Sequence, residues 1–348
     1  MSLTRRTAII ALLRIATCGG SAMASTPQAR AEELPPASAL PGPSLKAVNH
    51  TDMIILTVDK TSLQAELKTW PETETQSALL KRFRIGIGKI KGDKEHEGDN
   101  KTPEGVYFAQ SHIDGNRLPI KYGKRAIPLD FPNPIDRSEG KTGHGIWLHG
   151  VEYDKRVEEA NVTEGCVVFY NADISSLSNW LKSYQGVVVI ASDINQVNRA
   201  ADLAAVKKRT QDWMHSWAER RPKDYLGFYR ADFSFGRQTF RAYAKYKERV
   251  FKSYKDMAVT FDNLRVVTHP KYAVAFFNQD FHGDKRYTSI GRKALYWEKD
   301  GAGDWSIKRE VFENRRFEFM TFTDAELSLL SDASSVHGTG VVKKSPNL

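Results

Sequence analysis

The strongest constraint on the fold is a change of pattern near residue 193. Before it, short β-prone runs alternate with polar turns and glycines, at residues 53–58, 63–67, 83–88, 106–108, 144–149, 166–170 and 186–191. One helix is predicted at 175–184, with Asp173 as its N-cap. Many short strands with one late helix predict a β-rich domain.

After residue 193 the pattern is first helical and then alternating. Helices are predicted at 195–220 and 237–255, and the first has one apolar face, formed by Val206, Thr210, Trp213 and Trp217. Turns then separate four predicted strands, at 258–267, 272–281, 286–297 and 305–311. Helices followed by a long antiparallel meander predict a second domain, of the α+β class.

The first residues predict export. Arg5 and Arg6 precede a short apolar stretch, and an Ala-Met-Ala cleavage pattern ends at residue 24. We therefore predict a signal peptide at 1–24 and a flexible lead-in, rich in Pro, Ala and Ser, at 25–46. Processing as a lipoprotein at Cys18 is an alternative.

Charge and cysteine content exclude several classes of protein. The chain has 348 residues with 51 Lys+Arg against 42 Asp+Glu, a net charge of +9 that is too diffuse to predict nucleic-acid binding. Two cysteines, Cys18 and Cys166, exclude a disulfide framework and a thiolate-rich zinc site. Once the leader is removed, Cys166 is the single thiol, and a functional role is expected for it.

The chemistry is predicted at Cys166 and His149. Residues 145–150 read Gly-Ile-Trp-Leu-His-Gly, and residues 163–168 read Thr-Glu-Gly-Cys-Val-Val. An imidazole that withdraws the thiol proton makes the sulfur a nucleophile, as a thiolate–imidazolium pair. His149 ends one predicted strand and Cys166 begins the next. Gly165 permits close backbone approach, so amides beside Cys166 are candidate oxyanion donors.

These motifs resemble the signature of the YkuD-type L,D-transpeptidases, the cysteine enzymes of bacterial peptidoglycan. His149-Gly150 matches the histidine half of that signature, and Thr163, Gly165 and Cys166 match the cysteine half. The segment that precedes the strand at 106–108 also resembles the corresponding segment of that family. The resemblance implies Cys166 as nucleophile, His149 as base, and a Gly150 carbonyl that orients the imidazole.

The resemblance further implies a β-rich sandwich catalytic domain over residues 47–193. Its reaction would break the diaminopimelate–D-alanine bond of tetrapeptide stems and leave a thioester on the enzyme. An amine acceptor would then give a cross-link, whereas water would trim the stem. The substrate would be peptidoglycan and the location the periplasm, with no cofactor, no metal and no transmembrane span after signal removal.

Two departures from the signature alter the predicted pocket. Glu164 stands where the family has histidine, and Val168 where arginine or asparagine is common. Both favour the branch that includes L,D-carboxypeptidases. Thr163 and Glu164 are therefore predicted to line the pocket. His144 is predicted to be structural or substrate-lining, on the face of its strand opposite to His149.

Residues 194–315 resemble the NTF2-like domain that is fused to a cell-shape-determining L,D-carboxypeptidase of this family. The resemblance implies an α+β cone domain that positions the enzyme on the wall or on an envelope protein partner. Residues 316–348 are predicted to be a C-terminal tail. Two alternatives stay open: a catalytically silent wall-binding scaffold, and an amidase that releases wall-anchored protein.

Overall fold

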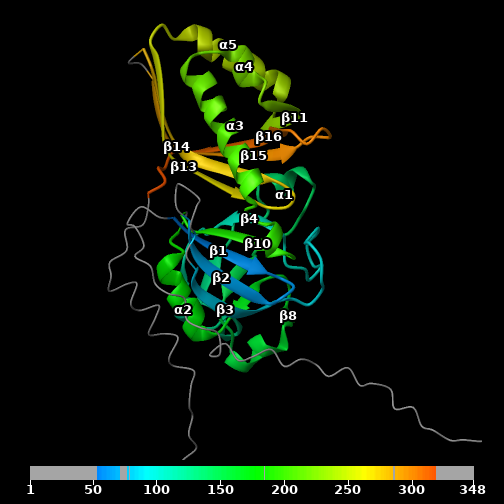
Figure 1. Ribbon diagram of the computed structural model, residues 1–348. Helices are drawn as coiled ribbons and strands as arrows, with labels where there is room; N and C mark the ends of the chain where they lie inside the picture. The colour runs from blue at the N-terminus through cyan, green and yellow to red at the C-terminus, as the bar shows by residue number, and fades with distance from the viewer. Residues whose placement is uncertain (1–52, 71–76, 78, 184, 285–286, 319–348) are drawn as a thin grey trace, which may run out of the picture. The chain divides into compact units, whose positions relative to one another are not determined.

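The computed structural model describes residues 53–70, 77, 79–183, 185–284 and 287–318 (Figure 1). All of these belong to one compact unit, residues 36–348. The predicted signal peptide, the lead-in and most of the predicted tail lie outside the described residues. Within the described part, no helix is long and apolar enough to cross a membrane.

The first domain is a curved ten-stranded sheet with two short helices. Its strand order is β4-β10-β1-β2-β3-β9-β7-β6-β5, and β8 pairs with β3. The strands are β1 (Met53–Asp59), β2 (Gln64–Trp70), β3 (Leu79–Gly88), β4 (Gly105–Phe108), β5 (Ile113–Asp114), β6 (Arg125–Pro128), β7 (Trp147–His149), β8 (Asn161–Thr163), β9 (Val167–Phe169) and β10 (Val187–Ala191). The helices are α1 (Pro134–Ser138) and α2 (Asn171–Trp180).

The sheet curves until its two ends meet. A bridge between Ala109 and Leu129 joins the end of β4 to the end of β6, which lie far apart in the strand order. One apolar core lies between the two halves, because alternate residues of β1, β3, β9 and β10 point inward. Val58, Ile85, Phe169 and Ile190 are examples, and all four are buried.

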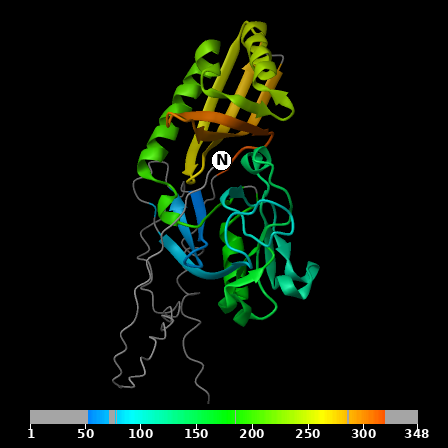
Figure 2. The same ribbon diagram turned by 90° about the vertical axis from the view of Figure 1, so that its right-hand side faces the viewer.

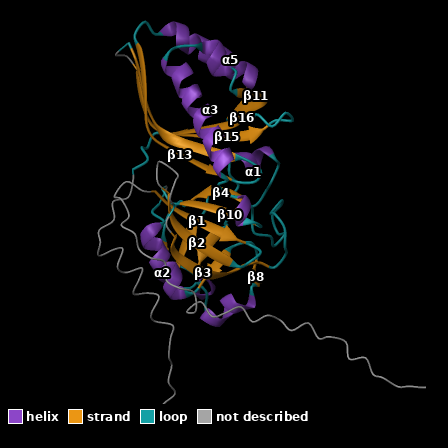
Figure 3. Ribbon diagram, viewed as in Figure 1, coloured by secondary structure: helices purple, strands orange, loops and turns teal. Residues whose placement is uncertain are grey.

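The second domain is a six-stranded sheet covered by helices (Figures 2 and 3). The strand order is β12-β11-β16-β15-β14-β13, with β11 parallel to β16. The strands are β11 (Tyr229–Phe235), β12 (Gln238–Thr239), β13 (Met257–Thr268), β14 (Ala273–Gly283), β15 (Tyr287–Lys299) and β16 (Trp305–Glu313). The helices are α3 (Ala200–Ala218), α4 (Pro222–Leu226) and α5 (Phe240–Ser253).

The predicted α+β class is confirmed, and the differences are local. Helix α2 begins at Asn171 and not at the predicted residue 175, and Asp173 lies in its first turn, where it pairs with Lys81 at 3.1 Å and does not cap the helix. Strand β7 covers three residues of the predicted strand at 144–149. Gly143 and Gly145 have φ values of +101° and +70°, which break the extended backbone before Trp147.

In the second domain the long strands follow the prediction, whereas α4, β11 and β12 were not predicted. Residues 316–318, which the sequence assigns to the tail, are packed against the sheet. Phe317 is buried, and its backbone N–H donates to the Asn278 side chain at 2.6 Å. The Asn278 amide donates back to the Phe317 carbonyl at 3.0 Å.

Candidate active site

Strands β7 and β9 place the predicted histidine and cysteine on one face of the sheet. They pair in parallel, with Leu148 opposite Val167 and His149 opposite Val168. Leu148 and Val167 point into the core. Since side chains alternate along a strand, His149 and Cys166 project from the other face, as diagonal neighbours across the pair.

The Cys166 thiol is partly exposed at the start of β9. It donates a hydrogen bond to the Gly145 carbonyl oxygen, with Sγ and O 3.4 Å apart. Burial of the sulfur atom raises the thiol pKa to about 11, against a backbone hydrogen bond from Trp147 that lowers it. The negative charge of Glu164 contributes to this rise. At neutral pH the resting group is therefore a thiol.

His149 ends β7 and is buried. Its Nδ1 lies 2.5 Å from the Gly150 carbonyl oxygen. Because a carbonyl can only accept, Nδ1 carries the proton and the Nε2 lone pair stays available as a base. Burial lowers the pKa of His149 to about 4, and the bond to Gly150 acts against this shift. The Tyr122 ring stands edge-on to the imidazole, with centroids 5.0 Å apart.

These shifts favour a neutral thiol and a neutral imidazole in the free protein over the thiolate–imidazolium pair predicted from the sequence. Both pKa shifts favour the neutral forms, because both groups lose hydration on burial. A positive charge at Lys121 affects both groups in the same sense, lowering the pKa of His149 and of Cys166. A neutral thiol beside a neutral imidazole can still react, if the proton moves as the sulfur attacks.

Thr163 and Gly165 shape the backbone before the sulfur. The Thr163 hydroxyl donates to the Cys166 carbonyl at 2.7 Å and accepts from the Gly165 amide at 3.1 Å. The amide of Gly165 is therefore engaged, which argues against its predicted use as an oxyanion donor. Gly165 has φ +131°, and a Cβ atom on it would lie 2.8 Å from the Lys101 carbonyl oxygen. The glycine is required here by both conformation and space.

Glu164 and His144 are the other two residues predicted to line the pocket, and they lie in different places. Glu164 is exposed beside the thiol. The side chain of His144 is 83% exposed and lies outside β7, with Nδ1 3.5 Å from a Glu97 carboxylate oxygen. The prediction that His144 and His149 occupy opposite faces of one strand is therefore wrong, because the strand begins only at Trp147.

Asn171 was not singled out by the sequence. Its side-chain amide donates to the Val151 carbonyl at 2.7 Å, and its oxygen accepts from the Lys124 amide at 2.9 Å. A Cβ atom on Gly150 would lie 2.4 Å from that same oxygen. Asn171 thus fixes the backbone on which the imidazole-orienting carbonyl lies. Its place directly after the predicted strand at 166–170 is the signal that could have identified it.

No group of three or more His, Cys, Asp or Glu side chains that could hold a metal ion occurs in the described part of the chain. The polar groups around the thiol are backbone carbonyls, one hydroxyl and one imidazole. Such a set suits acyl transfer, in which sulfur attacks a carbonyl carbon and an imidazole moves the proton.

Two family profiles match the chain. Residues 55–190 match the YkuD L,D-transpeptidase catalytic domain. Residues 205–311 match the C-terminal NTF2-like domain of Cds6. The chain is thus a YkuD-type L,D-transpeptidase domain followed by an NTF2-like domain. Both resemblances inferred from the sequence are confirmed at the level of the domain family.

Individual relatives are more distant. YafK of Escherichia coli (strain K12), named as a candidate L,D-transpeptidase, is 27% identical over 136 residues, which are 38% of this chain and 49% of YafK. The chain therefore spans about half the length of the curated relatives it matches.

Solved structures share the two-domain fold. Bd1075 of Bdellovibrio bacteriovorus superposes with a TM-score of 0.64 at 24% identity, over 78% of this chain and 94% of Bd1075. The helical cell shape determining protein Pgp2 of Campylobacter jejuni superposes with a TM-score of 0.60 at 24% identity, over 75% of this chain and 92% of Pgp2. At these identities the likeness is one of fold.

Proposed function

We propose that the chain is an exported cysteine acyl-transfer enzyme of peptidoglycan remodelling. Cys166 is the nucleophile, His149 the base and Gly150 the residue that orients it. The observation that supports this most is the placement of Cys166 and His149 on one face of a parallel strand pair, with Nδ1 bonded to the Gly150 carbonyl. That bond leaves Nε2 free to accept a proton.

The proposed substrate is a tetrapeptide stem. Cys166 Sγ attacks the carbonyl carbon of diaminopimelate, and its proton passes to His149. The bond to terminal D-alanine then breaks, and His149 protonates the leaving amine. A thioester remains, which either water or the amine of a second stem resolves, with His149 again as base.

The site of action is proposed to be the periplasm, with residues 1–24 removed on export. Likeness in fold to Pgp2, a helical cell shape determining protein, supports a role in shaping the wall. The second domain is proposed to position the catalytic domain, on the wall or on an envelope protein.

The test is incubation of the purified protein with disaccharide tetrapeptides and analysis of the products. Tripeptides with free D-alanine would identify an L,D-carboxypeptidase, and dimers would identify a transpeptidase. Cys166→Ser should abolish either product, because an alcohol is far less acidic than a thiol. Turnover that persists in Cys166→Ser would refute the assigned nucleophile. A reactive thiol without any product would refute the proposed substrate and favour the amidase.

A further inference from the structure

Residues 89–104, here called the β3–β4 loop, border the thiol. Ile90 and Lys101 form a bridge between the two ends of this loop. The Lys101 carbonyl packs on Gly165, where a Cβ atom would approach it to 2.8 Å. The loop and the residue before Cys166 are therefore closely packed.

The same loop also holds the segment at 141–146, which carries the thiol's hydrogen-bond acceptor. The Thr142 amide donates to the Glu95 carbonyl at 3.0 Å, and the Glu97 amide donates to the Thr142 hydroxyl at 3.2 Å. Gly145, three residues later, accepts from Cys166 Sγ. Two backbone segments around the sulfur are thus tied to one loop.

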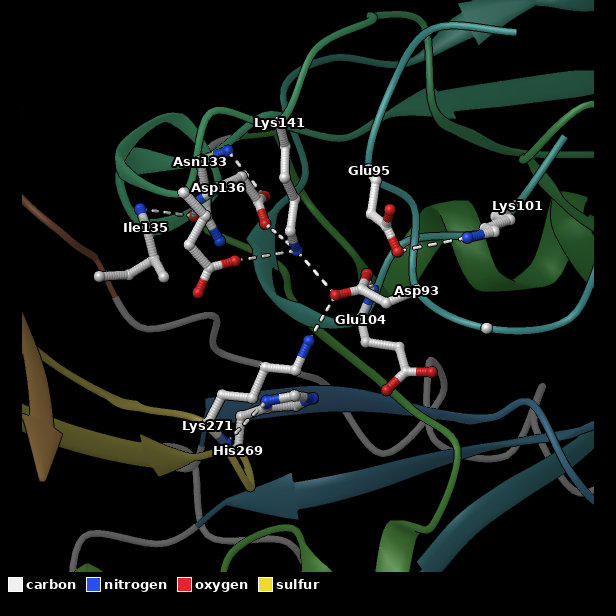
Figure 4. Close-up of polar contacts among 12 residues, drawn as sticks. Asp93, Glu95, Lys101, Glu104, Asn133, Ile135, Asp136, Lys141, His269 and Lys271 are labelled. Atoms are coloured by element: carbon white, nitrogen blue, oxygen red, sulfur yellow. Dashed lines mark hydrogen bonds and ion pairs between the residues drawn. The ribbon is translucent and has the colours of Figure 1, made fainter. Parts of the chain in front are cut away.

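Asp93 is the junction of this loop with the second domain (Figure 4). One carboxylate oxygen lies 2.8 Å from Lys141 Nζ and 2.5 Å from Lys271 Nζ. The other accepts from the Glu104 amide at 2.7 Å. Burial raises the pKa of Asp93, but the hydrogen bonds from Lys141 and Lys271 outweigh it and the net shift is downward. Asp93 therefore stays ionised and holds both lysines.

Lys271 comes from the turn between β13 and β14, and that turn is docked on the first domain. The buried Tyr272 hydroxyl accepts from the Val106 amide and from the Asn133 side chain, each at 2.7 Å. The Tyr272 carbonyl accepts from the His269 amide at 2.8 Å, which closes the turn. Lys271 is consequently held at a fixed position opposite Asp93.

We propose that Lys271 is a positioning residue for the active site. By holding Asp93, it fixes the β3–β4 loop, and the loop's hydrogen bonds to Thr142 hold the segment that carries Gly145. The NTF2-like domain then supports the reactive geometry of Cys166 and does not act only as a tether. This inference rests on the proposed function insofar as it takes Cys166 as the nucleophile.

The expected effect lies in geometry and not in global stability. The Lys271 side chain is 43% exposed, and an ion pair with such an exposed partner contributes little to folding stability. In contrast, a displacement of about 1 Å at a reacting group can change a rate by up to about 100-fold. A variant at this position should therefore remain folded while its thiol reacts differently.

The experiment uses the full chain carrying Lys271→Met. Lys299→Met is the matched control, because Lys299 is 45% exposed, pairs with Asp202 at 2.7 Å and lies in the same domain. Three quantities are measured: the rate of iodoacetamide alkylation of the Cys166 peptide, amide hydrogen exchange at 93–104 and 141–146, and turnover of disaccharide tetrapeptide. Lys271→Met should change alkylation and turnover about 3- to 100-fold and accelerate exchange in both segments.

Lys299→Met should match the wild type in all three, and Lys271→Arg should restore most of the loss. If Lys271→Met folds poorly, Lys271→Gln is measured instead, with the same expectation. Unchanged exchange and alkylation in a folded variant would overturn the proposal. Exchange and alkylation could respond to Lys271→Met while neither the wild type nor any variant turns over substrate. In that case the positioning role stands and the proposed function fails.

Discussion

Two buried sites, one in each domain, treat titratable groups in opposite ways. In the first, Cys166 and His149 are held by backbone carbonyls and shifted toward their neutral forms. In the second, Glu310 is buried as a carboxylate with Lys293 Nζ 2.6 Å away. Tyr229 and Tyr243 also donate to Glu310, at 2.8 and 3.0 Å.

Electrostatics explain the second arrangement. Burial raises the pKa of Glu310, but Lys293 and the nearby Lys247 outweigh it, and the net shift is downward. Among the residues that the structure describes, Lys247 has no comparable partner, and its Nζ stands 4.2 Å from the centroid of the Trp217 ring. Burial, with repulsion from Lys293, lowers the pKa of Lys247 to about 7.

The difference separates two uses of a polar group in a protein interior. A buried charge that is fully paired specifies packing, but its proton and lone pairs are already engaged. A nucleophile and its base must keep the proton and the lone pairs that they use available until substrate arrives. The Cys166 face retains an unengaged Nε2, whereas both carboxylate oxygens of Glu310 accept hydrogen bonds.

The largest expected effect that tests this contrast is the pH dependence of Cys166 alkylation. Iodoacetamide reacts with the thiolate form, and the thiol pKa is raised to about 11. The rate should therefore rise about tenfold per pH unit from pH 7, or about 1000-fold by pH 10. Iodoacetamide alkylation of the Cys166 peptide measures it. A plateau that begins near neutral pH would instead reveal a standing thiolate–imidazolium pair.

The second-largest effect is expected for the variant His149→Gln. Loss of the base should lower turnover about 100- to 10,000-fold, because general-base catalysis contributes about that much. The matched control is His215→Gln, an exposed histidine of α3 that pairs with Glu219, and it should keep wild-type turnover. In the wild type, activity should fall in acid only near pH 4, the pKa at which His149 becomes protonated. A decline centred at pH 6.5 would contradict the buried, neutral imidazole.

Glu310→Gln tests the other side of the comparison. It leaves Lys293 buried without its counter-charge, so the free energy of unfolding should fall by about 3–5 kcal/mol. Asp212→Asn is the control, since its side chain is 48% exposed and pairs on α3 with Lys208, which is 74% exposed. Urea unfolding of both variants measures the difference. Equal small losses would mean that the buried pair contributes no more than a surface pair.

Sequence patterns predicted the parts of the molecule whose causes are local. The β-prone run at 53–58 predicts a strand and the motif around Cys166 predicts a nucleophile, because each prediction depends on neighbouring residues. The strand start at Trp147 was mispredicted, since two positive-φ glycines override the β-prone run. The Lys271–Asp93 pair joins residues 178 positions apart, and no local pattern announces a contact of that range.

The smallest expected effect comes from two glycine substitutions. They distinguish the cost of backbone strain from the effect of the contact between the β3–β4 loop and Gly165. Gly165 and Gly98 both have positive φ, +131° and +80°. An alanine at Gly98 would meet nothing within 4 Å, so Gly98→Ala should lose only about 1 kcal/mol of unfolding free energy to strain. Gly165→Ala should lose about 1–3 kcal/mol, because its Cβ would also push on the Lys101 carbonyl.

That push should displace the β3–β4 loop and change the alkylation rate of Cys166, which Gly98→Ala should leave unaltered. Urea unfolding and alkylation of the two variants therefore measure strain and contact separately. Equal losses with equal alkylation rates would mean that the loop does not constrain the sulfur. The thiol face would then be set by the strand pair of β7 and β9 alone.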